Sequence, residues 1–187
     1  MLASQRLKNE NIVLDAVWSS DLKRCAETAE LIVKYAPSKK GVSPVIVLDE
    51  DLREREMGEL EGMSVAQATI KCEKEGKTFH DYGEPRKQAV KRLNRAFDNI
   101  VSESLEKHYR NIMIVSHGGV VSKFIHHLVT DRGFKLSQAI TLHHLRVPHN
   151  ASFTKVFVDE ETRKGIVQTF GDAKHLEVKV EADQEAL

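Results

Sequence analysis

The stretch "IMIVSHGGVV", residues 112–121, decides the fold class of this protein. Its first part, extended to residues 111–116, is short, rich in β-branched residues and apolar throughout, which predicts a strand covered on both faces of a parallel sheet. Residues 120–129 show helical periodicity. Because a glycine pair separates the strand from the helix, this order is typical of an α/β domain.

The remaining strands predict the same architecture. They are short, apolar and bounded by polar or turn residues, and the last two form a hairpin turning at 158–165. Together they predict an α/β fold of three layers, with a mostly parallel sheet and flanking helices. The predicted strands are residues 12–18, 44–48, 152–158 and, from a weaker signal, 165–170.

Two further helices complete the pattern. One follows "SSD", with Ser20 or Asp21 as the expected N-cap. The other covers residues 84–107, with Pro85 near its start, where the missing N–H is harmless. The side chains of this second helix that are expected to cover the sheet are Leu93, Phe97 and Ile100.

Length and composition predict one compact domain. The chain has 187 residues, of which 41% are hydrophobic, enough for a substantial core. We expect a single domain over residues 1–180 and an acidic, mobile tail over residues 181–187. Neither a repeat nor a low-complexity tract divides the chain.

Charge and cysteine usage limit the partners. The 28 basic side chains balance the 28 acidic ones. This balance disfavours non-specific electrostatic binding of nucleic acid, which needs an excess of basic residues. Cys25 and Cys72 suggest no disulfide framework, so the expected compartment is the cytoplasm, with the nucleus also open. No apolar run is long enough to predict a membrane span. The sequence leaves the oligomeric state open.

His117, Gly118 and Gly119 follow a predicted strand and precede a helix. Ligands of open α/β sheets bind outside the carboxyl ends of the strands. Glycines let backbone N–H groups approach an anion, and the start of a helix favours negative charge. The alternative is a tight turn in which His117 is satisfied within the loop.

Arg24 and Glu54 follow two other predicted strands. Arg24 lies in "VWSSDLKRCAETAELI", residues 17–32, and its guanidinium suits a phosphate. Glu54 lies in the charged loop "DLREREMGELEG", residues 51–62, where one carboxylate could donate a proton. The alternatives are a solvated helical arginine and an exposed charged loop.

Taken together, these segments resemble the histidine phosphatase superfamily, which has the phosphoglycerate-mutase-like fold. The order "SSDLKRCAETA", "LREREMGELEG", "VSHGG" and "NAS…GDAKHL" is that of the family and spans nearly the whole chain. The first two segments are most similar to the small fungal broad-specificity phosphatases and the TIGAR-like branch.

The resemblance implies a function and a site. It implies a phosphatase for small phosphorylated metabolites that works through a phosphohistidine and uses no metal or cofactor. Arg24, His117 and Gly118 would bind the phosphoryl group, with His117 contacting it during transfer. Glu54 would protonate the leaving oxygen.

The sequence also departs from the family. The family begins with a central strand that ends in Arg-His-Gly, whose histidine is the nucleophile, and this tripeptide does not occur here. Ser122, followed by Lys123, stands where relatives often have arginine. We therefore expect the fold without its first, central strand, as in a truncated product or an incomplete gene model.

Three functional interpretations follow. One is a phosphatase whose parent protein is active while this chain is impaired. The second is a non-catalytic module that binds a phosphorylated ligand or partner. The third, a nucleotide-binding α/β protein, is disfavoured because neither G-x-G-x-x-G nor G-x-x-x-x-G-K-[ST] is present.

Overall fold

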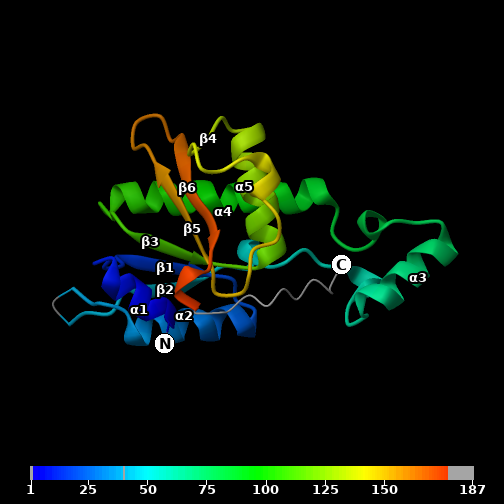
Figure 1. Ribbon diagram of the computed structural model, residues 1–187, viewed down its shortest axis with the longest axis horizontal. Coiled ribbons are helices and arrows are strands. Elements are labelled where there is room, and N and C mark those ends of the chain that lie inside the picture. The colour runs from blue at the N-terminus through cyan, green and yellow to red at the C-terminus, as the bar shows by residue number, and fades with distance from the viewer. Residues whose placement is uncertain (1, 40, 177–187) are drawn as a thin grey trace.

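A parallel sheet organises the computed structural model, which describes residues 2–39 and 41–176 (Figure 1). Its three strands are β1 (Ala16–Ser19), β2 (Val45–Leu48) and β3 (Ile112–Val115), in the order β2-β1-β3. Ser19 is in register with both Leu48 and Val115. All three strands therefore end at the same level, and the loops that follow them share one edge of the sheet.

Helices cover both faces of this sheet. Helix α1 (Leu2–Asn9) and helix α2 (Lys23–Tyr35) lie on one face, and helix α4 (Arg86–Glu106) lies on the other (Figure 1). The first face is closed by Val17 and Val115 packing on α2, and the second by Ala16 and Trp18 packing on α4. The prediction of an α/β fold with three layers and a parallel sheet is confirmed.

The predicted stripe of α4 is buried, although of its three residues only Ile100 packs in the core shared with the parallel sheet. Leu93 is 5% exposed and Ile100 is 2% exposed. Phe97 is half-buried and packs against the core on the α5 side. The helix therefore takes its position from burial of one apolar stripe, as its period predicts.

A second, smaller sheet contains the predicted hairpin. It consists of β4 (Lys135–Leu136), β6 (Gly165–Asp172) and β5 (Phe153–Val158), in that order, with β5 and β6 antiparallel. Helix α5 (Gly118–Thr130) packs on this sheet through Leu128, which meets Phe134 and Val167 in a common core.

The later part of the segment between β2 and α4, from Leu60 to Tyr82, forms a separate lobe. Helix α3 (Val65–Glu75), which the sequence analysis did not predict, stands to one side of the sheets (Figure 1). It packs its own small core of Leu60, Ala68, Cys72 and Tyr82. Five short 3₁₀ turns complete the described elements: η1 (Glu50–Leu52), η2 (Gly58–Leu60), η3 (Phe79–Asp81), η4 (Leu142–His144) and η5 (Lys174–Leu176).

One expectation about β3 was wrong. Its apolar run predicted cover on both faces, but Ile114 is 39% exposed. Within the described residues β3 pairs only with β1, and the two sheets share no strand pairing. The strand is therefore an edge among the elements described, which leaves part of it open.

Two further points concern the extent of the chain. The predicted acidic tail at residues 181–187 lies outside the described residues. Among the helices that the structure describes, none combines the length and the apolar character needed to cross a bilayer.

Candidate active site

The residues singled out in the sequence follow strands that end together. Arg24 is the second residue of α2, the helix after β1, while Glu54 follows β2 and His117 follows β3. Backbone hydrogen bonds continue the sheet into these loops, since Ser20 N–H donates to the carbonyl of Val115 over 2.9 Å. The candidate site is thus built on the carboxyl edge of the parallel sheet, where ligands of such sheets bind.

Arg24 and His117 are in direct contact. The Nε–H of Arg24 donates to Nδ1 of His117 over 3.1 Å. A nitrogen that accepts a hydrogen bond carries no proton, so the ring proton of the neutral imidazole is on Nε2. Nε2 lies 3.0 Å from the Ser20 hydroxyl oxygen, to which it can donate.

The surroundings of His117 keep the imidazole neutral. The side chain is buried at the N-cap of α5, and the Sγ of Cys25 lies 3.6 Å from its Nε2. Burial, followed by the positive charge of Arg24, lowers the pKa of His117 from its ordinary value of 6.5, while Glu54 opposes the shift. The ring therefore serves as a hydrogen-bond donor through Nε2.

Arg24 retains donors for a ligand. Its side chain is exposed at the start of α2, and only Nε is engaged within the part of the chain that the structure describes. The two terminal nitrogens of the guanidinium are directed by the contact with His117 and can form a bidentate pair with an anion.

Glu54 lies over the first turn of α5. A Cβ at Gly119 would come within 3.0 Å of Oε2 of Glu54. Oε1 accepts the backbone N–H of Arg55 over 3.0 Å. Gly118 is just as restricted, since a Cβ there would lie 2.8 Å from Cγ1 of Val147. The two glycines therefore leave room for the side chains of Glu54 and Val147, which a larger residue would displace.

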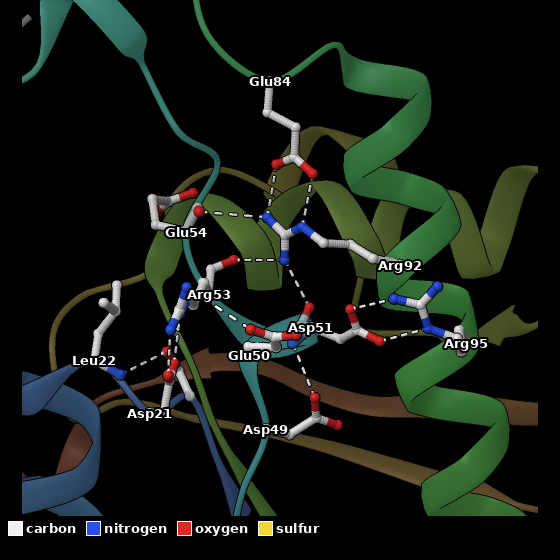
Figure 2. Close-up of polar contacts among 11 residues, drawn as sticks. Asp21, Leu22, Asp49, Glu50, Asp51, Arg53, Glu54, Glu84, Arg92 and Arg95 are labelled. Atoms are coloured by element: carbon white, nitrogen blue, oxygen red, sulfur yellow. Dashed lines mark hydrogen bonds and ion pairs between the residues drawn. The ribbon is translucent and has the colours of Figure 1, made fainter.

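Arg92 clamps the loop that carries Glu54 (Figure 2). Its guanidinium donates to the backbone carbonyls of Asp51, Arg53 and Glu54, over 2.6, 2.8 and 3.3 Å. Two further bonds of 2.8 Å join it to the carboxylate of Glu84. Figure 2 shows this guanidinium between Glu84 and the loop. Arg92 was not predicted from the sequence, because a helical arginine carries no local signal of the distant carbonyls that it binds.

A second arginine ties the same loop to α2. Arg53 forms a bidentate pair with Asp21, with distances of 2.7 and 2.5 Å (Figure 2). This pair explains why the predicted N-cap was wrong. Leu22 is the N-cap of α2 and has no side-chain cap, because Asp21 binds Arg53 and Ser20 lies against His117. The Ser20 hydroxyl also accepts the N–H of Leu22 over 3.3 Å, and neither side chain caps α2.

Arg55 is structural. Its guanidinium is buried and donates to the carbonyls of Phe79, Tyr82 and Glu84. It therefore joins the Glu54 loop to the lobe that contains α3. Of the two arginines beside Glu54, neither is free to bind a ligand.

The structure thus brings Arg24 and His117 into contact and places Glu54 beside the glycines that follow His117. No hydrogen bond joins Glu54 to Arg24 or His117 within the described residues. Nor does any hydrogen bond there join His117 to another histidine. The described part of the site therefore contains the hydrogen-bond donors of Arg24, the imidazole of His117 and the carboxylate of Glu54.

Comparison with known proteins shows the family. The histidine phosphatase superfamily (branch 1) matches residues 1–170. The broad-specificity phosphatase YOR283W of Saccharomyces cerevisiae is 33% identical over 91% of this chain and 70% of its own length. The probable phosphatase C1687.21 of Schizosaccharomyces pombe is 34% identical over 94% of this chain and 78% of its own length.

The fold agrees with this assignment. A phosphoglycerate mutase from Bacillus anthracis superposes with a TM-score of 0.70 at 19% identity, covering 94% of this chain and 80% of that structure. The chain belongs to the histidine phosphatase superfamily. It has the α/β fold with a parallel sheet and flanking helices that its structural neighbours share.

Proposed function

We propose that this chain supplies the phosphate-binding and proton-donating part of a phosphatase that hydrolyses small phosphorylated metabolites. The reaction converts a phosphomonoester and water into an alcohol and inorganic phosphate. The contact between Arg24 and His117 carries the proposal, because it holds a permanent cation, whose terminal nitrogens have no other partner among the described residues, against a neutral imidazole at the edge of the sheet. Membership of a phosphatase family and similarity to two fungal phosphatases support it.

Each residue would have a distinct role. The terminal nitrogens of Arg24 and the backbone N–H of Gly118 would bind the phosphoryl oxygens, and the Nε2–H of His117 would join them by exchanging its partner, the Ser20 hydroxyl, for the ligand. Such donors stabilise the negative charge that phosphoryl transfer spreads over these oxygens. Glu54, held by its loop beside Gly119, would donate a proton to the leaving oxygen.

The covalent step needs a second imidazole. Nδ1 of His117 accepts from Arg24 and Nε2 bears the proton, so His117 has no free lone pair with which to attack phosphorus. In the proposed reaction another histidine forms an N–P bond while the ester P–O bond breaks and Glu54 protonates the alkoxide. Water then breaks the N–P bond and returns a proton to Glu54.

We therefore propose that the 187 residues alone turn over slowly. Removing a covalent nucleophile costs on the order of 10⁶ in kcat in a protease comparison, which sets the scale. The test is hydrolysis of p-nitrophenyl phosphate by this chain and by the chain preceded by a strand ending in Arg-His-Gly. The matched control replaces that strand's histidine with alanine.

We expect turnover only with the histidine-bearing strand. Equal and robust rates for all three proteins would contradict the proposed division of roles, because the described residues would then suffice.

A second candidate function is phospholigand binding without turnover. The observation that favours it is that Arg24 and His117 are preorganised although no other histidine hydrogen-bonds to His117 in the described part of the chain. This candidate predicts that calorimetry detects vanadate binding that Arg24→Ala weakens, while the strand-extended protein remains inactive. Absence of anion binding by the folded chain would exclude it.

A further inference from the structure

A cavity of about 480 Å³ adjoins the candidate site. Glu54 and Gly119 line it, whereas Arg24 and His117 do not, so it lies on the Glu54 side. Its far wall comes from the first turns of α4 and the middle of α5. The volume is typical of pockets for small molecules, about 300–1,000 Å³.

Three cationic side chains on this wall form no ion pair within the described part of the chain. Arg86, Lys87 and Lys123 line the cavity and are exposed. In the described residues none of their side chains forms a hydrogen bond or an ion pair, in contrast to Arg55 and Arg92, whose guanidinium groups bind carbonyls. Three cations that have no partner among residues 2–39 and 41–176 give this wall a positive potential.

The acidic side chains of the cavity do not neutralise this charge. Glu54 lies beside Gly119, one turn of α5 before Lys123, and forms no ion pair with the three cations among the described residues. Asp131 keeps its charge but contacts His127 Nδ1 and the hydroxyl of Thr130, over 3.0 and 2.5 Å. The five arginine and lysine side chains of the lining outnumber these two carboxylates. The cationic wall thus has no carboxylate of its own chain committed to it among the described residues.

The position of Arg86 and Lys87 is itself unfavourable without an anion. Both lie in the first turn of α4, where the helix already presents its positive end. Pro85 at the N-cap makes no side-chain hydrogen bond, and neither α4 nor α5 has an acidic residue in its first turn. A bound anion would offset this concentration of positive charge.

Part of the cavity lining is apolar. Side chains from both helices form this part without offering a hydrogen bond, and they would contact the carbon skeleton of a ligand. They are Val90, Leu93, Val120 and Phe124.

We propose that this cavity binds a second anionic group of the substrate. The inference rests on the proposed function, which places the transferring phosphoryl group at Arg24 and His117. The preferred substrates are then phosphomonoesters that carry a phosphate or a carboxylate at the other end of a short carbon skeleton. Arg86, Lys87 and Lys123 bind that group and set the specificity.

The test compares three probes that differ only at the far end. Butyl phosphate has one anionic group, 4-phosphooxybutanoate adds a carboxylate, and butane-1,4-diyl bisphosphate adds a phosphate. Calorimetry on the full chain gives the Kd of each, or KM is measured where the ester is hydrolysed. We expect the probes with two anionic groups to bind at least about tenfold more tightly, the scale of one charge-assisted hydrogen bond.

The variants separate the two parts of the site. The triple variant Arg86→Gln, Lys87→Gln, Lys123→Gln is expected to remove the preference and to leave the affinity for butyl phosphate unchanged. Lys91→Gln is the matched control, because Lys91 is exposed on α4 outside the cavity lining. A thermal melt of each variant verifies folding.

The outcomes distinguish the proposals. If butyl phosphate binds but the wild type shows no preference, or if the preference survives the triple variant, the subsite is wrong and the proposed function stands. If no probe binds to the folded chain, the proposed function is wrong and the subsite falls with it. If only one of the two probes with a second group is preferred, that probe identifies the group.

Discussion

The Nε of Arg24 lies 3.1 Å from Nδ1 of His117, so an exposed guanidinium and a buried imidazole form one unit at the edge of the sheet. Each residue determines the state of the other. Arg24 fixes the tautomer of His117, and His117 orients the guanidinium. The predictions below follow from this unit and from the loop that carries Glu54.

Replacing Arg24 is expected to abolish tight anion binding. Arg24→Ala removes the permanent cation and frees Nδ1, so the affinity for vanadate should fall about 10- to 100-fold, the scale of a charge-assisted bidentate pair. Arg24→Lys should recover only part of this, because an ammonium lacks the planar fork. Calorimetry measures both, with the exposed Lys23→Ala as control. Unchanged affinity in Arg24→Ala would remove Arg24 from the site.

Replacing Arg92 is expected to destabilise the fold and to misplace Glu54. Arg92 and Glu84 are each 14% exposed at their side chains. Breaking such a pair leaves a carboxylate and three backbone carbonyls without their donor, so Arg92→Gln should lower the free energy of unfolding by about 3 kcal/mol. Arg95→Gln is the control, because Arg95 is 58% exposed and binds Asp51 at the surface. Its cost should stay below about 1 kcal/mol in urea unfolding. Similar losses for both variants would argue against the clamp.

The stability of the chain should depend on pH through His117. The folded chain holds the pKa of His117 below 6.5, so between those two pKa values the unfolded chain binds more protons. The contribution of His117 to the free energy of unfolding is therefore fully present above pH 6.5. It is lost as the pH falls from 6.5 to the lower pKa of the folded chain. His117→Gln should make that slope shallower in urea titrations at several pH values, and His126→Gln controls for the loss of an exposed imidazole. An unchanged slope in His117→Gln would show that His117 does not contribute.

Adding a methyl group at Gly119 should displace the carboxylate of Glu54. The new Cβ would meet Oε2 and Oε1 of Glu54 at 3.0 and 3.1 Å, and both are the end of a flexible side chain. Gly119→Ala should therefore fold with a loss of at most about 1 kcal/mol, while hydrolysis by the strand-extended protein falls about 10²-fold or more, the scale of general acid catalysis. Glu54→Gln should lower the rate similarly, and the double variant should be no slower. Additive losses would show that the glycine acts on something other than Glu54.

The sequence predicted the parts of the fold that depend on local periodicity. The stripe of α4 through Leu93 and Ile100, and the hairpin of β5 and β6, appear in the structure because apolar period and turn chemistry are local signals. Helix α3 was missed, since its small core is shared with Leu60 and Tyr82 outside the helix.

The site was only partly predictable for the same reason. Motif order placed Arg24, Glu54 and His117 at the ends of strands, and parallel strands bring such ends together. The clamp of Arg92 on the 51–54 loop and the use of Asp21 by Arg53 depend on contacts across 38 and 32 residues. A local pattern contains no information on such distant partners. The predicted N-cap was wrong because the carboxylate of Asp21 binds Arg53, which is distant in the sequence.

Nitrogen NMR of the ring of His117 during a titration with inorganic phosphate tests the central claim most directly. Before phosphate is added near neutral pH, the imidazole should be uncharged with its proton on Nε2. Added phosphate should then shift the Nε2–H signal until the site saturates, and Arg24→Ala should abolish this response. An Nδ1-protonated ring, or a shift at a different histidine while His117 stays silent, would mean that the anion is held elsewhere.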